Sequence, residues 1–360
     1  MSELKSLIIF LSQYDLTSAK ICNILDVLAK PSISAFKKSK NQFKNLINEK
    51  VLNKMLDCAD EAIVHTYTLN LANKGIKIVT KFDEDFPRQL QDLPDAPVIL
   101  YYMGDLNLVN TQTLAVVGTR KPSNYGYMVT ERLVRDATSA GITIVSGLAY
   151  GVDSIAHRKC LELGGKTIAV LGGGFEHIYP LEHHSLAMEI AEKGLLLSEY
   201  RPKMNATKYT FPTRNRIVAG LSDGVLITEA GIKSGTIHTK DFALEYGKNI
   251  YAVPGNIDSP NSELTNQIIK YGQAACVTQS DDILRDYQNL NNKENVVQPS
   301  FFDASDEEKI IIECLKDGMK SIDELTKKCK LSMNIFNTCL TTLEISGIIK
   351  RLPGGVVALN

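Results

Sequence analysis

The sequence lacks the residue patterns of secreted, zinc-binding and membrane-spanning proteins. Its seven cysteines are scattered and show no CxxC spacing, which indicates free thiols in a reducing compartment. No apolar run approaches the ~18 residues that cross a membrane. The opening stretch MSELKSLIIFLSQYD has only a short apolar run with charges close by, unlike a signal peptide. We therefore expect a soluble cytoplasmic protein with no membrane partner.

The sequence also lacks an excess of either charge. It holds 40 basic and 41 acidic residues, for a net charge of −1, so binding of a polyanion would depend on local clustering. One cluster lies between positions 200 and 222, which contain no Asp or Glu and five basic residues: Arg201, Lys203, Lys208, Arg214 and Arg216. The motif FPTRNR at 211–216 adds an aromatic ring to this stretch.

Common catalytic motifs are missing as well. The sequence has no GxGxxG, GxxxxGK[ST], GxSxG or HExxH, so an NAD fingerprint, a P-loop, a nucleophile elbow and a zinc-protease site are unsupported. Asp153 and His157 could hold a water or a metal, but a helix-cap acid and a packed histidine are favoured. Glu199 and Glu229 could serve as acid and base, or could bind backbone amides of neighbouring loops. We expect no cofactor, no metal and no enzymatic activity.

Three segments with different patterns follow one another. Residues 1–75 read as short helices, because their apolar residues have helical spacing. In residues 76–285, short β-rich runs alternate with helical segments, which predicts a parallel sheet covered on both faces in a Rossmann-like α/β domain. Its first part, FDEDFPRQLQDLPDAPVILYYMGD, reads as a lead-in with proline turns.

The last part of the chain predicts a linker and a winged-helix domain. Residues 286–305 are polar and rich in Asn, as in a linker, and residues 306–360 predict three helices and a hairpin. Ser321 and Glu324 have the spacing of a capping box. The third helix, at about 332–346, contains no Lys or Arg, although a helix that reads a DNA groove normally carries such residues. We expect this domain to contact protein, or to strengthen DNA binding only weakly.

Glycine-rich turns mark the candidate binding site. In open α/β sheets, ligands bind at the carboxyl ends of the strands, and the turns around Gly118, Gly147, Gly172 and Gly235 fall there. Glycine lets backbone N–H groups face an anion, and a helix N-terminus favours negative charge. Arg120 ends the first such strand, where its guanidinium suits a phosphodiester. The other interpretation of each turn is close packing of a helix on the sheet.

Lys208 and Phe211 complete this site. A basic groove with an aromatic platform is typical of proteins that bind single-stranded nucleic acid. In the competing interpretation, Phe211 packs inside, and Arg214 and Arg216 pair with carboxylates.

Seven motifs in order resemble the DNA processing protein A family, also called Smf. They cover about residues 75–280 and read VVGTRKPSNYG, IVSGLAYGVDSIAH, IAVLGGGFEHIYP, LLSEY, FPTRNRIVAGLS, ITEAGIKSGTIHT and YAVPGNI. The resemblance implies a Rossmann-like domain acting as a homodimer, flanked by a sterile-alpha-motif-like domain and a winged helix. It also implies binding of single-stranded DNA and loading of the RecA recombinase in natural transformation and recombination.

The sequence pattern and the resemblance together predict nine DNA-binding residues: Gly118, Arg120, Ser146, Gly147, Lys208, Phe211, Arg214, Arg216 and Gly235. The alternative is a nucleotide-processing enzyme, because EAGIKSGT distantly resembles phosphoribohydrolases of a similar fold, in which Glu229 would be catalytic.

Overall fold

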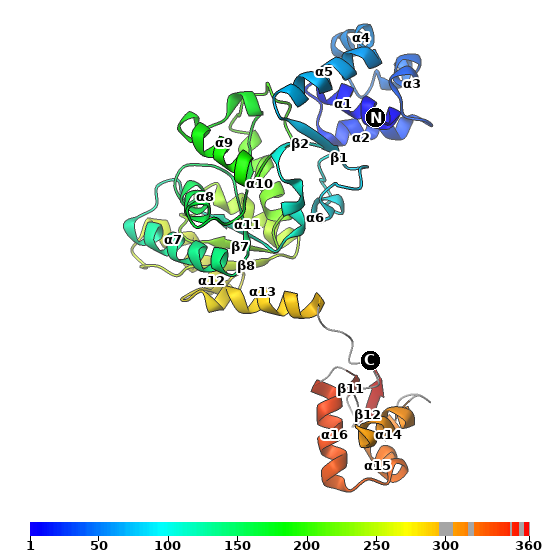
Figure 1. The fold of residues 1–360 in the computed structure, drawn as a ribbon, viewed down its shortest axis with the longest axis vertical. Helices are drawn as coiled ribbons and strands as arrows, with labels where there is room; N and C mark the ends of the chain where they lie inside the picture. Colours follow the sequence, from blue (N-terminus) through cyan, green and yellow to red (C-terminus); the bar gives the residue numbers. More distant parts are fainter. Residues whose placement is uncertain (295–304, 316–319, 346–347, 353–355, 360) are drawn as a thin grey trace. The chain divides into compact units, whose positions relative to one another are not determined.

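The computed structural model describes residues 1–294, 305–315, 320–345, 348–352 and 356–359. The chain divides into two compact units, Met1–Arg285 and Asp286–Asn360. Figure 1 colours both along the sequence. In the described residues, no helix combines the length and the apolar character needed to cross a bilayer.

The chain begins with a small helical domain, as predicted for residues 1–75. Its elements are α1 (Glu3–Ser12), α2 (Ser18–Val27), α3 (Ile33–Lys38), the 3₁₀ turn η1 (Lys40–Phe43), α4 (Glu49–Asp57) and α5 (Glu61–Asn73). Side chains of Ser2, Thr17 and Ser32 cap α1, α2 and α3, accepting hydrogen bonds from backbone N–H groups of the first turn.

The rest of the first unit is built on a nine-stranded sheet with the order β1-β2-β6-β5-β4-β3-β7-β8-β9. The strands are β1 (Lys77–Thr80), β2 (Ile99–Gly104), β3 (Thr113–Val117), β4 (Thr143–Ser146), β5 (Thr167–Val170), β6 (Leu195–Ser198), β7 (Gly224–Ile227), β8 (Asn249–Ala252) and β9 (Ala275–Cys276). From β6 to β9 all pairs are parallel, which confirms the Rossmann-like prediction. The predicted lead-in differs, because it holds β2, which pairs antiparallel with both β1 and β6.

Helices connect these strands and cover the sheet (Figure 1). They are α6 (Arg88–Gln91), α7 (Asn124–Ser139), α8 (Val152–Glu162), α9 (His184–Lys193), α10 (Thr210–Gly220), α11 (Thr236–Glu245) and α12 (Glu263–Lys270). Strand β3 lies between β4 and β7, so the chain builds outward from β3 in one direction and then restarts beside it. The point between β3 and β7 is a topological switch point, where the loops diverge and leave room for a ligand.

Hydrophobic packing joins the helical domain to the sheet. One buried cluster contains Phe10 and Phe36 of the helical domain together with Leu196 of the sheet. A second cluster contains Leu195 and Leu197. Since successive strand residues face opposite sides of a sheet, the two clusters cover its two faces, and the helical domain shares the core of one face.

The second unit has the elements expected of a winged helix. They are α14 (Asp306–Leu315), β10 (Lys320–Ser321), α15 (Ile322–Cys329), α16 (Met333–Ile345), β11 (Ile349–Leu352) and β12 (Val356–Leu359), with strand order β10-β12-β11. The capping box of Ser321 and Glu324 is present. Phe336, Leu340 and Leu343 of α16 are buried in the core of this unit.

The predicted linker is only partly a loop. Helix α13 (Asp281–Glu294) continues through positions 286–294, so these residues are helical where the sequence analysis expected irregular chain. A high proportion of Asn lowers helix propensity but does not prevent a helix. The remainder of the predicted linker, 295–304, lies outside the described residues.

Candidate nucleic-acid interface

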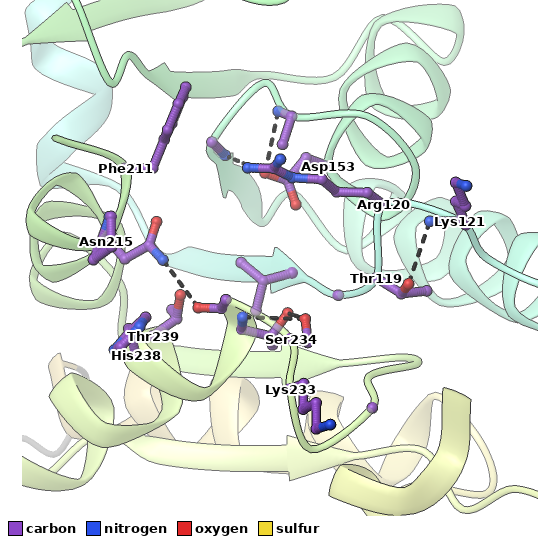
Figure 2. Close-up of a pocket in the computed structure, with 18 of the residues that line it drawn as sticks. Thr119, Arg120, Lys121, Asp153, Phe211, Asn215, Lys233, Ser234, His238 and Thr239 are labelled. Atoms are coloured by element: carbon purple, nitrogen blue, oxygen red, sulfur yellow. Dashed lines mark hydrogen bonds between the residues drawn. The ribbon is translucent and has the colours of Figure 1, made fainter. Parts of the chain in front are cut away.

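A cavity of about 1170 Å³ opens at the carboxyl ends of the central strands. It is lined by the loop after β3, the loop after β4 and the N-terminal ends of α10 and α11, and Figure 2 shows their side chains. It therefore occupies the switch point between β3 and β7. We call it the switch-point cavity.

The loop after β3 supplies the strand-end arginine. Gly118 is required here, because a Cβ at this position would lie 2.7 Å from the Glu229 carbonyl oxygen and from a methyl of Val152. The Thr119 N–H donates to that same Glu229 carbonyl at 2.7 Å, which fixes the loop to the end of β7. The exposed Arg120 side chain then projects over the cavity, with its guanidinium carbon 5.6 Å from the centre of the Phe211 ring.

Helix α10 brings the lysine and the phenylalanine to the same cavity. Hydrogen bonds between Thr207 and Thr210 shape its first turn, so that Lys208 and Phe211 lie beside the strand ends. The Phe211 ring rests on Gly172, where a Cβ would lie 2.7 Å from a ring carbon. Phe211 is half-buried, held in place but still able to present part of its ring to a ligand.

Helix α11 directs its N-terminus at the cavity. Ser234, Gly235 and Thr236 form this end, and the Asn215 side chain of α10 donates to the Gly235 carbonyl at 3.3 Å (Figure 2). A Cβ added to Gly235 would meet no protein atom within 4 Å, so this position faces open space. The helix N-terminus offers N–H groups and a positive dipole end to an anion.

Arg214 lies in the floor of the cavity and is only 4% exposed. Its guanidinium donates to the carbonyl oxygens of Gly147 and Val170. It passes so close to Gly147 that a Cβ there would lie 2.5 Å from the guanidinium carbon. Asp153 accepts hydrogen bonds from the N–H groups of Gly147 and Ala149. Burial raises the pKa of Asp153, while the Arg214 charge and these amides oppose the shift. Arg214 is thus mainly a support for the β4 loop.

Arg216 departs from the sequence prediction. It is 5% exposed, does not line the switch-point cavity, and pairs with Glu199 at 2.6 Å and Asp95 at 3.4 Å. Arg201 pairs with Asp15 at 2.8 Å. The stretch 200–222 is therefore not one exposed cationic strip: two of its arginines are buried, and a third is engaged by a carboxylate.

Of the nine predicted site residues, seven line the switch-point cavity: Gly118, Arg120, Gly147, Lys208, Phe211, Arg214 and Gly235. The two that do not are Arg216 and Ser146, whose hydroxyl is buried and donates to the Val116 carbonyl. Among the polar lining residues that the sequence analysis did not name for the site are Lys121, Asn215 and Lys233. The first two are neighbours of predicted residues, and Lys233 lies within the motif ITEAGIKSGTIHT.

The lining of the cavity is cationic. Its charged members are the basic residues Arg120, Lys121, Lys208, Arg214 and Lys233 and the acidic residues Asp153 and Glu263. Asp153 is buried against two backbone amides, which leaves the exposed Glu263 as the acidic group at the opening. Five basic residues outnumber the two acidic ones, and a walled cavity with an excess of positive charge attracts anions.

The acidic residues considered for catalysis have structural partners. One Glu229 oxygen accepts from the Ser123 N–H at 2.8 Å and the other from the Ser123 hydroxyl at 2.6 Å, which secures the start of α7. His157 is buried, shares a 2.7 Å hydrogen bond with Thr167, and has its pKa lowered to about 3 by burial. In the described part of the chain, no group of three or more His, Cys, Asp and Glu residues could hold a metal ion.

Two segments of the chain match known protein families. Residues 77–288 match the family of DNA recombination-mediator protein A, and residues 298–355 match the DprA winged helix domain. The chain belongs to the DNA recombination-mediator protein A family. It is 36% identical to protein Smf of Escherichia coli over 77% of this chain and 76% of that one. It is 40% identical to DNA processing protein DprA of Streptococcus pneumoniae over 57% and 72% of the two chains.

Solved structures of this family have the same fold. DprA from Streptococcus pneumoniae matches with a TM-score of 0.62 and 30% identity, covering 79% of this chain and 98% of that one. DNA processing protein A from Helicobacter pylori, described for its single-stranded DNA binding mode, matches with a TM-score of 0.54 and 34% identity, covering 61% and 96%.

Proposed function

We propose that this protein binds single-stranded DNA in the switch-point cavity and delivers it to the RecA recombinase. The observation that carries the proposal is that Arg120, from the loop after β3, and Lys208 and Phe211, from the start of α10, converge on one cavity. If the Arg120 guanidinium and the Lys208 ammonium lay on opposite sides of the molecule, they could not bind the same DNA strand in this cavity.

The groups that line the cavity suit the two parts of a nucleotide. Arg120, Lys208 and the N-terminus of α11 are donors for phosphate oxygens. The half-buried Phe211 ring is a platform for a base, and stacking on such a ring is worth about 1–3 kcal/mol. A base can reach a ring inside a cavity only when it is unpaired, so the arrangement favours a single strand over a duplex.

RecA loading, action as a homodimer and a cytoplasmic location belong to the same proposal. Their support is the membership in the recombination-mediator family, together with a DNA-binding cavity whose acidic candidates have structural partners. In the proposed role the protein presents the strand and the recombinase acts on it.

A binding assay with matched single- and double-stranded oligonucleotides, each with and without RecA, tests this function. We expect tighter binding of the single strand, a steep fall in affinity with salt, and faster RecA filament formation on protein-bound DNA. The Arg120→Ala and Lys208→Ala variants should lose both effects. Equal affinity for duplex and single strand, or undiminished binding by both variants, would contradict the proposed site.

A further inference from the structure

The outer part of the N-terminal helical domain is strongly basic. Residues 28–54 contain one acidic residue, Glu49, and seven lysines: Lys30, Lys37, Lys38, Lys40, Lys44, Lys50 and Lys54. All seven are exposed. They lie on α3, α4 and the turns beside them, which Figure 1 shows in blue at the end of the domain that carries the N-terminus. We call these seven residues the lysine surface.

The lysine surface is distinguished by the density of its positive charge, which no carboxylate partner neutralises. Elsewhere in the first unit, Lys5 pairs with Asp83 at 2.8 Å and Lys74 pairs with Glu176 at 2.7 Å. Among the described residues, no ion pair involves any of the seven lysines. In a chain with net charge −1, such a concentration of unneutralised charge suits a polyanion.

Two further cavities lead from the DNA site towards this surface. A cavity of about 880 Å³ lies between α10 and α2 and shares Pro212 and His238 with the switch-point cavity. A smaller cavity of about 340 Å³ shares Asp15 and Arg201 with the second. The smaller one is also lined by Lys54, a member of the lysine surface.

The cavity of about 880 Å³, between the other two, contains groups that can contact a DNA strand. Tyr209, at its edge, is 73% exposed, and the Lys208 ammonium lies 5.0 Å from the centre of its ring. The carboxylates that face this cavity are bound by arginines: Glu199 and Asp95 by Arg216, and Asp15 by Arg201. Lys81 also lines this cavity, so three basic side chains balance the three carboxylates along the path.

We propose that one DNA strand extends from the switch-point cavity, past Tyr209 and through these cavities, to the lysine surface of the helical domain. This inference rests on the proposed function and deepens it, because it assigns the N-terminal domain a role in holding the strand backbone. Charge complementarity and the lining residues that neighbouring cavities share carry it. The lysines contact phosphates, so they add affinity without sequence preference.

Removal of three of these charges in the full-length protein tests the path. The variant carries Lys37→Gln, Lys40→Gln and Lys44→Gln, and its control carries Lys159→Gln on α8, Lys166→Gln just before β5 and Lys193→Gln on α9. Binding is measured with single strands of about 6 and about 30 nucleotides, a range that spans one and several contact sites. Unfolding curves verify that both variants fold.

We expect the lysine-surface variant to bind the long strand about tenfold more weakly and the short strand as the wild type does. The slope of log affinity against log salt for the long strand should decrease by about 2, close to 0.7 for each of the three lost contacts. The control variant should keep wild-type affinity for the long strand.

An undiminished affinity of the lysine-surface variant for the long strand would overturn the path and leave the switch-point cavity intact. An equal loss in the control variant would show that only net charge matters and would also overturn it. If the lysine-surface variant lost affinity only for duplex DNA or for anionic vesicles, the path would also be overturned, because the lysines would then bind another partner. Failure of the wild type to bind the short strand at all would reject the proposed function itself, and with it this path.

Discussion

Helices α10 and α16 occupy the positions where each domain could meet DNA, yet they differ in what they expose. The start of α10 brings Lys208 and Phe211 to a cavity with a cationic lining. Helix α16 contains no Lys or Arg, and its Phe336 and Leu340 are buried. The winged-helix fold alone therefore does not supply basic side chains to this helix. Function depends on the side chains that the fold presents.

The same contrast exists among α10 and the residues just before it. Lys208 is exposed, and Phe211 and Asn215 line the cavity, while Arg214 bonds to backbone carbonyls and Arg216 to carboxylates. Charge in the sequence thus has two uses here, contact with a ligand and support of the loops that form the site. Mutations should separate these uses, because the first affects binding and the second affects folding.

The largest effect should come from a buried support. Arg214→Met leaves the Gly147 and Val170 carbonyls and the Asp153 carboxylate without their buried partner, and we expect a loss of about 3–5 kcal/mol in the free energy of unfolding. Denaturant titration measures it. Arg158→Met, on the exposed side of α8, is the control and should change stability by less than about 0.5 kcal/mol. A stable Arg214→Met protein that fails only to bind DNA would make this arginine a ligand contact instead.

The combined Arg120→Ala and Lys208→Ala variant should show the opposite pattern. Both side chains are exposed, so stability should stay close to wild type. Hydrogen bonds to charged groups are worth about 1.5–3 kcal/mol each, so the loss of two should lower single-strand affinity by about 100-fold or more. Fluorescence anisotropy with a labelled oligonucleotide measures this loss. If the unfolding free energy falls in step with affinity, the two groups act as supports.

Phe211 should lie between these extremes. Phe211→Ala removes a stacking platform worth about 1–3 kcal/mol, so we expect affinity to fall about tenfold or more for single strands. Phe211→Leu is the informative companion, because it fills the space against Gly172 without an aromatic face. Equal affinity of the Leu variant and the wild type would show that the ring serves only packing.

A pair of glycines gives a finer separation. Gly235→Ala should leave stability unchanged, since a Cβ there meets no protein atom within 4 Å, but it should narrow the space for phosphate and weaken binding about threefold. Gly147→Ala should instead destabilise the protein, because a Cβ at position 147 would overlap the Arg214 guanidinium. Thermal unfolding and anisotropy on both variants distinguish the two effects, and a destabilised Gly235→Ala would mean that no space is reserved for a ligand.

Much of the site could be predicted from the sequence because strand ends are local features. A hydrophobic run that ends in glycine marks the carboxyl end of a parallel strand, and parallel strands place those ends at one edge. The two antiparallel strands at the far edge could not be found in this way. The run PVILYYMGD has strand character, but its pairing with β6 joins residues about a hundred positions apart.

The placement of Arg216 was missed for a geometric reason. Phe211, Asn215 and Val218 recur at i, i+4 and i+7 and line the cavity, as one face of a helix requires. Arg216 follows Phe211 by five residues, about 140° around the axis at 3.6 residues per turn. Helical phase therefore predicts that it turns away, although its pairing with Glu199 depends on tertiary structure.

The smallest effect should come from α16. Asn334 and Asn337 are the side chains of this helix that we consider for hydrogen bonds to bases. The helix that carries them has no basic residues. Replacement of both by Ala in the full-length protein should change affinity for single- and double-stranded DNA by less than about twofold, because neither offers charge to a phosphate. A fragment of residues 286–360, which forms a compact unit with its own core, should likewise bind DNA weakly. If that fragment binds as tightly as residues 1–285, the contrast between the two helices fails, since an uncharged helix would then be sufficient for DNA recognition.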